Sequence, residues 1–204
     1  HAILDDVVDG YFDITDQLDD ELQRIEDDLF SDIDGIDGTA AQQSRYLAPL
    51  LKAERRCAYA LTEAGAGSDL GSLKTEAKRD GAGWVLNGAK LWIHNAPIAD
   101  FAAVLARTDP DRSIGHRGLS MFIVPKERGD AHGFELTSDS AHGTGKMEGR
   151  PIDTIGYRGM HSYEIALEDW WVPAENQVGM EDGPGKGFYY QMAGFENGRL
   201  QTAA

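Results

Sequence analysis

The sequence predicts an α+β fold in which an antiparallel β-barrel or sandwich-like middle domain is flanked by helical segments of N- and C-terminal α-domains. From Cys57 to Pro173, β-rich runs bounded by Gly, Asp and Pro follow one another with no long helix between them, which argues against a doubly wound α/β domain. Apolar residues at helical spacing occur on either side of this stretch. We therefore expect an acidic helical segment over 1–54, a β-domain over 55–178 and the start of a helical domain over 179–204.

Charge is concentrated at the N-terminal end of the chain. The net charge of the 204 residues is −16, and residues 1–38 hold fourteen acidic side chains against the single base Arg24. The remaining part is nearly neutral and has no basic stripe, so we expect no binding of nucleic acid. No apolar run approaches ~18 residues, so no membrane span is expected.

The first helix is expected within the acidic segment. Thr15 is a suitable N-cap, and one apolar face is formed by Leu18, Leu22, Ile25 and Leu29. The following "SDIDGIDG" is an acidic turn rather than a calcium loop, because counting from Asp32 puts Ile36 and Asp37 where an EF-hand needs an oxygen ligand and a glycine. No histidine pair has HxH or HExxH spacing, so no metal site is predicted.

A second helix is predicted from Thr39. Thr39 and Gln42 form a capping box, the apolar face comprises Tyr46, Leu47, Leu50 and Leu51, and Pro49 is expected to kink or shorten the helix. The lone Cys57 excludes an internal disulfide and fits a reducing compartment. It is more typical of a packed hydrophobic residue than of a nucleophile.

The β-domain is expected to contain a hairpin at "GWVLNGAKLWI", because Asn87-Gly88 is typical of a type I′ turn. Further strands are predicted at "FAAVLART", "GLSMFIVP" and "YEIALEDWWVP", and a mobile loop at the polar, Gly-rich "SDSAHGTGKMEGRP". After Gly185 the spacing of Phe188, Met192 and Phe195 predicts a helix. The pattern runs to Ala204 and the chain begins at His1, so we expect a piece of a longer protein.

The segment "YALTEAGAGSDLGSLKT" combines bare backbone, hydroxyls and a carboxylate. Gly65, Gly67 and Gly71 read GxGxxxG, but the βαβ context of a dinucleotide fingerprint is absent. Two interpretations remain from the residues alone. One is a surface turn, since Gly, Ser and Asp are common turn formers. The other is a cradle in which small residues let main-chain N–H groups approach an anionic ligand.

Six segments, in order, resemble the acyl-CoA dehydrogenase family: "YALTEAGAGSD", "GWVLNGAKLWIHN", "DFAAVLARTDP", "GLSMFIVPK", "GYRGMHSYEIALEDWWVPAEN" and "GKGFYYQMAGFENGR". The resemblance covers the middle β-domain and the entry to a C-terminal helical bundle. It implies a flavoenzyme that uses FAD to oxidise an acyl-CoA thioester to the trans-2-enoyl-CoA. In this reaction a carboxylate removes the α-proton while hydride leaves the β-carbon for flavin N5.

The resemblance also implies roles for individual residues. Tyr59 to Ser68 would bind the flavin, with Leu61 and Thr62 bonded to the polar edge of the isoalloxazine. Gly67 and Ser68 would border the pyrophosphate, and Ser68 would also contact the acyl-CoA. Trp92, Ile93 and His94 would lie against the flavin, with Trp92 as a flat apolar wall and His94 on the same face of the strand. His94 departs from the Thr or Ser that is usual in the family, so it could contact the flavin or have swung away.

On the expected C-terminal helix, Glu196 and Arg199 would line the acyl-CoA channel, or simply pair with each other. Gly198 stands where one branch of the family has its catalytic glutamate, and glycine cannot act as the base. In the larger branch of the family the base lies further along in the C-terminal domain, so the resemblance implies a base beyond Ala204. The alternatives are a non-catalytic flavin-binding or structural subunit of a hetero-oligomer, and a related flavin oxidase or monooxygenase. The family further implies fatty acid β-oxidation, an electron-transferring flavoprotein as acceptor, a homodimer or homotetramer, and a cytoplasmic or mitochondrial-matrix location.

Overall fold

The computed structural model describes residues 39–203, apart from 130–131, 141–142 and 157–160. Within this range, residues 39–192 belong to one compact unit, and the chain from Ala193 belongs to a second unit. The helix predicted over Leu18–Leu29 and the acidic turn after it lie outside the described residues.

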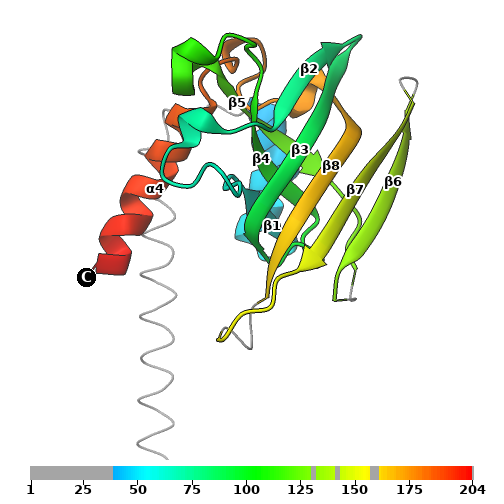
Figure 1. The fold of residues 1–204 in the computed structure, drawn as a ribbon, viewed down its shortest axis with the longest axis vertical. Helices are drawn as coiled ribbons and strands as arrows, with labels where there is room; N and C mark the ends of the chain where they lie inside the picture. Colours follow the sequence, from blue (N-terminus) through cyan, green and yellow to red (C-terminus); the bar gives the residue numbers. More distant parts are fainter. Residues whose placement is uncertain (1–38, 130–131, 141–142, 157–160, 204) are drawn as a thin grey trace, which may run out of the picture. The chain divides into compact units, whose positions relative to one another are not determined.

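The unit of residues 39–192 is built around one sheet in which β1, β4, β2, β3, β8, β7 and β6 follow in that order, with β5 paired to β4. Figure 1 shows β2, β3, β8, β7 and β6 side by side across this curled sheet. The strand bounds are β1 Cys57–Ala60, β2 Glu76–Asp80, β3 Gly83–His94, β4 Phe101–Arg107, β5 Leu119–Pro125, β6 Phe134–Ser140, β7 Gly143–Pro151 and β8 Ser162–Pro173.

Most strand pairs are antiparallel, as the lack of long connecting helices predicts. The exceptions are β1 and β2, which pair with β4 in parallel. The predicted fold class is confirmed: the β-domain is a strand-rich curled sheet with a few helices. Its core comes from alternate strand positions, including Leu86, Phe122 and Val172, whose removal from water stabilises the fold by about 1.5–3 kcal/mol per side chain.

The hairpin predicted at Asn87-Gly88 is wrong, because β3 runs straight through both residues. The turn lies earlier, at Gly81–Ala82, between the paired residues Asp80 and Gly83. Asn87 instead faces a bulge in β8. Its side chain donates to Asp169 Oδ1 at 3.1 Å, and its own Oδ1 accepts from the Asp169 N–H at 2.9 Å.

Gly88 has a different reason to be glycine. Its φ is +151°, and a Cβ there would lie 2.6 Å from the Cα of Thr75. The close approach of the Gly88 and Thr75 backbones therefore explains the glycine of the Asn-Gly pair, from which turn propensity had predicted a hairpin.

The mobile loop predicted over 138–151 is also wrong. β6 and β7 pair antiparallel from Phe134↔Gly149 to Ser140↔Gly143, and β7 pairs on its other side with β8. Gly149 lies under the ring of Phe134, while Met147 is buried in the core. Glycine in this segment thus serves close packing rather than flexibility.

The helix predicted from Thr39 is present, as α2 (Ala40–Gln42), a π-helical turn η1 (Gln43–Leu47) and α3 (Ala48–Leu51). The capping box is confirmed, with Thr39 N donating to Gln42 Oε1 at 3.1 Å and Gln42 N donating to Thr39 Oγ1 at 3.3 Å. The π-helical turn precedes Pro49, whose ring cannot accommodate a regular bond to the preceding turn. Tyr46 is the buried member of the apolar face.

The predicted C-terminal helix is α4, Gly187–Ala203. Short 3₁₀ turns complete the connections: η2 Leu70–Ser72, η3 Arg112–Gly118, η4 Ala174–Asn176 and η5 Met180–Asp182.

Candidate functional site

The glycine-rich segment after β1 is a tight turn with exposed backbone. Glu63 and Ala66 exchange both of their backbone hydrogen bonds, at 3.0 and 3.1 Å, so Ala64 and Gly65 form the tip. Gly65 and Gly67 are exposed, and a Cβ built on either residue meets nothing within 4 Å. Packing inside the chain therefore does not require these glycines, and the space beside them is open to a ligand.

A buried ion pair attaches this turn to β3. Lys90 of β3 is 0% exposed, Glu63 is 9% exposed, and Lys90 Nζ lies 2.9 Å from Glu63 Oε1. The ammonium also donates to the Leu61 carbonyl at 3.0 Å. Glu63 in turn accepts from the backbone N–H groups of Lys74 at 2.6 Å and Thr75 at 2.9 Å.

Burial and pairing act in opposite directions on the two charges. Burial lowers the pKa of the Lys90 ammonium to about 8, against the opposing influence of Glu63. Burial alone would raise the pKa of Glu63, but Lys90 and the N–H donors of Lys74 and Thr75 outweigh it and hold that pKa below its ordinary value. Glu63 is therefore ionised at neutral pH.

Trp92 occupies a strained bulge next to the turn. In β3, Leu91 and Trp92 lie between the pairs Lys90↔Ile165 and Ile93↔Tyr163, opposite one residue of β8. Trp92 has a φ of +63°, which is an outlier for a bulky side chain. Its indole is 49% exposed. Such strain in a native structure motivates a search for function.

His94 and Tyr59 are also exposed near the same elements. His94 is exposed, while Ile93 between it and Trp92 is 1% exposed; because the bulge at Trp92 interrupts the strand alternation, the sharing of one face by Trp92 and His94 stays a prediction. His94 Nδ1 lies 3.0 Å from the Oγ of the buried Ser162, which orients the imidazole. Tyr59, at the end of β1, has an exposed ring.

The structure brings the two segments predicted to bind flavin together. The Leu91 N–H donates to the Thr62 carbonyl at 2.7 Å, and Lys90 contacts the Leu61 carbonyl. Leu61 is buried and Thr62 partly buried, while Gly67 and Ser68 lie exposed beyond the turn. Glu196 and Arg199 stand on α4 within the second unit, so their part in a substrate channel stays a prediction.

Sequence reasoning missed Lys90 and Glu63. The signal was present in the alternation of β3, where Trp84, Leu86 and Lys90 share the inward-facing phase. A lysine in that phase indicates a buried partner, because an ammonium without one is rarely fully buried.

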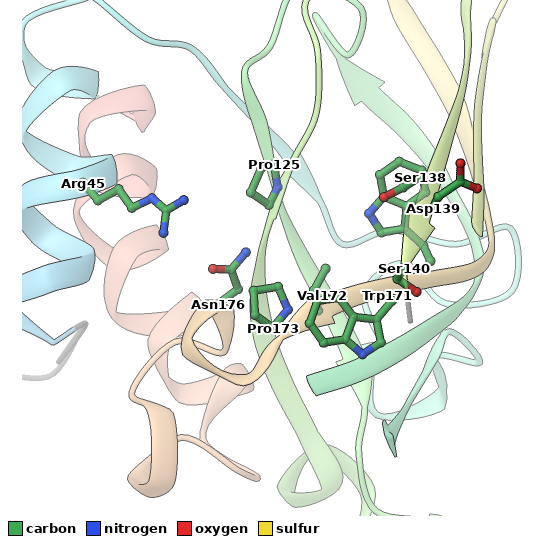
Figure 2. Close-up of a pocket in the computed structure, with 10 residues that line it drawn as sticks. Arg45, Pro125, Ser138, Asp139, Ser140, Trp171, Val172, Pro173 and Asn176 are labelled. Atoms are coloured by element: carbon green, nitrogen blue, oxygen red, sulfur yellow. The ribbon is translucent and has the colours of Figure 1, made fainter. Parts of the chain in front are cut away.

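The described residues also line a shallow hollow of about 390 Å³. Figure 2 shows Ser138 and Asp139 of β6 across the hollow from Arg45 and Asn176. None of the residues predicted to bind flavin or substrate lines it.

No group of three or more potential metal-ligating side chains occurs in the described part of the chain. The helices of that part are all too short or too polar to cross a membrane.

The chain belongs to the acyl-CoA dehydrogenase family, because residues 58–170 match the family model for the acyl-CoA dehydrogenase middle domain. Members of this family are flavoproteins, typically dependent on FAD.

Curated relatives and a solved structure agree with this assignment. The chain is 42% identical over 168 residues to (2S)-methylsuccinyl-CoA dehydrogenase of Cereibacter sphaeroides, covering 82% of this chain and 29% of that protein. It is 38% identical to the short-chain specific acyl-CoA dehydrogenase of Clostridium acetobutylicum, covering 82% of this chain and 39% of that protein. A probable acyl-CoA dehydrogenase from Mycobacterium abscessus superposes with a TM-score of 0.65 at 32% identity, covering 80% of this chain and 38% of that one. The chain thus spans between a quarter and two fifths of the length of these relatives.

Proposed function

We propose that this chain is the flavin-binding part of an FAD-dependent enzyme that oxidises an acyl-CoA thioester to its trans-2-enoyl-CoA. The observation that carries the proposal is the hydrogen bond from the Leu91 N–H to the Thr62 carbonyl, which holds the segment of the exposed, strained Trp92 beside the open turn after β1, in a chain that belongs to this family. As in the sequence-based prediction, we assign 1–54 and 179–204 to flanking helical domains and 55–178 to the β-domain.

The residues present fit the isoalloxazine of FAD. Its flat apolar face would lie on the indole of Trp92, whose bulge turns the ring outward. Its polar edge needs hydrogen-bond donors. The Thr62 N–H is one such donor, because none of the described residues accepts a hydrogen bond from it. Leu61, Thr62 and Tyr59 would hold this edge, and His94, oriented by Ser162, would stand at the end of the strand beside it. The side chain of Ile93 packs in the core, which leaves its backbone as the part that can contact the ring.

The pyrophosphate of FAD would be bound at the open turn. A phosphate needs N–H donors that approach closely. Gly67 and Ser68 are exposed, and a Cβ built on Gly67 meets no atom within 4 Å. The hydroxyl of Ser68 would reach from the same place toward the acyl-CoA. Glu196 and Arg199 are proposed as further substrate contacts from the C-terminal helical domain.

Bound FAD would supply the acceptor for the hydride that leaves the β-carbon of the substrate. The chain's own part is to position the two molecules and to exclude water. Glu63 is not a candidate for the base that removes the α-proton, because it is ionised, buried and bonded to three N–H donors. That carboxylate is expected outside these residues.

We further propose an electron-transferring flavoprotein as electron acceptor, a homo-oligomeric assembly, and a place in β-oxidation in the cytoplasm or the mitochondrial matrix. A non-catalytic flavin-binding subunit is the second candidate. It is favoured by Gly198, which supplies no carboxylate on α4 at a position where one branch of the family has its base.

The test is an anaerobic titration of the full-length protein with acyl-CoA thioesters of graded length and branching, followed by visible absorption. Bleaching of a flavin band by one class of thioester would support the dehydrogenase and identify its substrate. A flavin band that no thioester bleaches would support the non-catalytic subunit. Absence of flavin after incubation with FAD would overturn both. Rapid reoxidation by oxygen after bleaching would instead support a related flavin oxidase or monooxygenase.

A further inference from the structure

The buried ion pair of Lys90 and Glu63 has no part in the proposed chemistry, although Glu63 belongs to the turn itself. A buried ammonium and carboxylate are costly to desolvate, and apolar residues of similar volume often stabilise a fold as well or better. The sheet already has an apolar core around this position. The contacts of the two charges therefore call for an explanation beyond stability.

The first contact fixes one peptide plane. Lys90 Nζ donates to the Leu61 carbonyl at 3.0 Å from inside the domain, and the described peptide bonds are all trans. In a planar trans peptide the C=O and the following N–H point in opposite directions. Because the Leu61 carbonyl points toward the buried ammonium, the Thr62 N–H points in the opposite direction, away from Lys90.

Neighbouring bonds leave this N–H as the donor available to a ligand. The Thr62 carbonyl accepts from Leu91 at 2.7 Å, and the Glu63 N–H donates to Ala66 at 3.0 Å. Among the described residues nothing accepts from the Thr62 N–H. A hydrogen bond from an ammonium to a carbonyl also polarises the peptide group, which makes its N–H a stronger donor.

The carboxylate holds the other end of the same segment. Glu63 binds Lys90 and accepts from the N–H groups of Lys74 and Thr75, which lie before β2. The side chain that neutralises Lys90 thus also attaches the turn to a second part of the sheet.

We propose that Lys90 is a positioning residue for the flavin, neutralised by Glu63, which orients the Leu61–Thr62 peptide so that the Thr62 N–H faces the isoalloxazine edge. This inference rests on the proposed function, since it assumes that FAD binds at this turn. Lys90 itself acts through the backbone and touches neither cofactor nor substrate.

The test compares FAD binding with stability in the full-length protein. Lys90→Met leaves Glu63 buried without a cation, so it is examined beside the double variant Lys90→Met with Glu63→Gln, which removes both charges and keeps an acceptor at position 63. The matched control is Lys78→Met, which breaks the exposed ion pair between Lys78 and Glu76 on β2. The FAD dissociation constant is measured by flavin fluorescence, and unfolding is measured in urea.

The double variant is expected to unfold at a urea concentration close to that of the wild type and to bind FAD about tenfold more weakly, since one misaligned hydrogen bond has an effect of this order. Its flavin absorption band should also shift, while Lys78→Met should change neither property. A folded double variant with wild-type FAD affinity and spectrum would overturn the proposal and leave the pair a purely structural one.

Amide hydrogen exchange in the wild type tests the same inference without a variant. The Thr62 amide should exchange rapidly in the apoprotein and be protected once FAD is bound. Equal protection in both states would overturn the proposal. A wild-type protein that binds no FAD would overturn the proposed function itself, an outcome distinct from a wild type that binds FAD and a double variant that binds it equally well.

Discussion

Gly88 gives the sharpest prediction about the fold. A Cβ at this position would lie 2.5 Å from Oγ1, 2.6 Å from Cα and 2.8 Å from Cβ of Thr75. Real Cβ atoms do not approach other atoms so closely, so Gly88→Ala must push β3 away from Thr75, the residue just before β2. Because one of the three contacts is with Cα, no rotation of the Thr75 side chain relieves it, and Thr75→Ser should not rescue the variant.

The size of the effect follows from two contributions. Forcing an extra methyl group into a packed site destabilises by about 1–3 kcal/mol, and a φ of +151° for an alanine in place of glycine adds about 1 kcal/mol. We expect Gly88→Ala to lower the free energy of unfolding by about 2–4 kcal/mol, and the midpoint of thermal unfolding by about 5–15 °C.

Urea and thermal unfolding, followed by circular dichroism, measure this loss. The matched control is Gly129→Ala, because a Cβ at Gly129 meets nothing within 4 Å and should change stability by less than about 0.5 kcal/mol. A loss below about 1 kcal/mol for Gly88→Ala would refute the close approach of the two backbones that explains the Asn-Gly pair.

Three further outcomes are expected. Hydrogen bonds from Arg128, with support from the Arg56 N–H, hold the pKa of Asp100 below its ordinary value. The ionised Asp100 therefore stabilises the fold at pH values above the ordinary pKa, and this stabilisation is lost as the pH falls through the lower pKa of the folded state. Asp100→Asn should lower the free energy of unfolding in urea by about 1 kcal/mol at pH 7, and equal stabilities of variant and wild type at pH 7 would contradict this. Gly149→Val should displace the ring of Phe134 and destabilise by about 1–3 kcal/mol, with faster amide exchange in β6; unchanged exchange would show that the packing is looser than described. Burial raises the pKa of the Cys57 thiol to about 11, so at pH 8 a thiol reagent should react with it only after unfolding, whereas rapid reaction in the native state would indicate a reactive cysteine.

Much of the fold could be predicted from the sequence, because its signals were local. Thr39 and Gln42 satisfy each other's backbone donors within a few residues, and the capping box appears as expected. The apolar runs that became β4, β5 and β8 carry enough buried residues to define strands by themselves.

The errors arose where a residue type served a distant contact. Gly88 is explained by Thr75, Asn87 by Asp169 and Gly149 by Phe134, and none of these partners is a neighbour in sequence. Turn propensity describes only the local conformations open to Asn and Gly. It therefore predicted a hairpin where β3 is continuous, and a loop where β6 and β7 pair.

The candidate site shows the same division. The glycines and the Trp92 segment could be singled out from the sequence, because their residue types are unusual for simple strands. The bulge that turns Trp92 outward and the ion pair under the turn depend on the register of β3 against β8 and on the approach of Glu63 to Lys90. Both are properties of tertiary packing.

The most direct test of the flavin site is the FAD affinity of Gly67→Val. A Cβ at Gly67 meets no atom within 4 Å, so the substitution should leave the urea midpoint unchanged, as should the control Gly129→Val. If Gly67 lies against the pyrophosphate of FAD, the valine side chain occupies the space of the ligand, and the dissociation constant for FAD should rise about a hundredfold, equivalent to about 3 kcal/mol. A stable Gly67→Val variant that binds FAD as tightly as the wild type would contradict the assignment of this turn to the flavin.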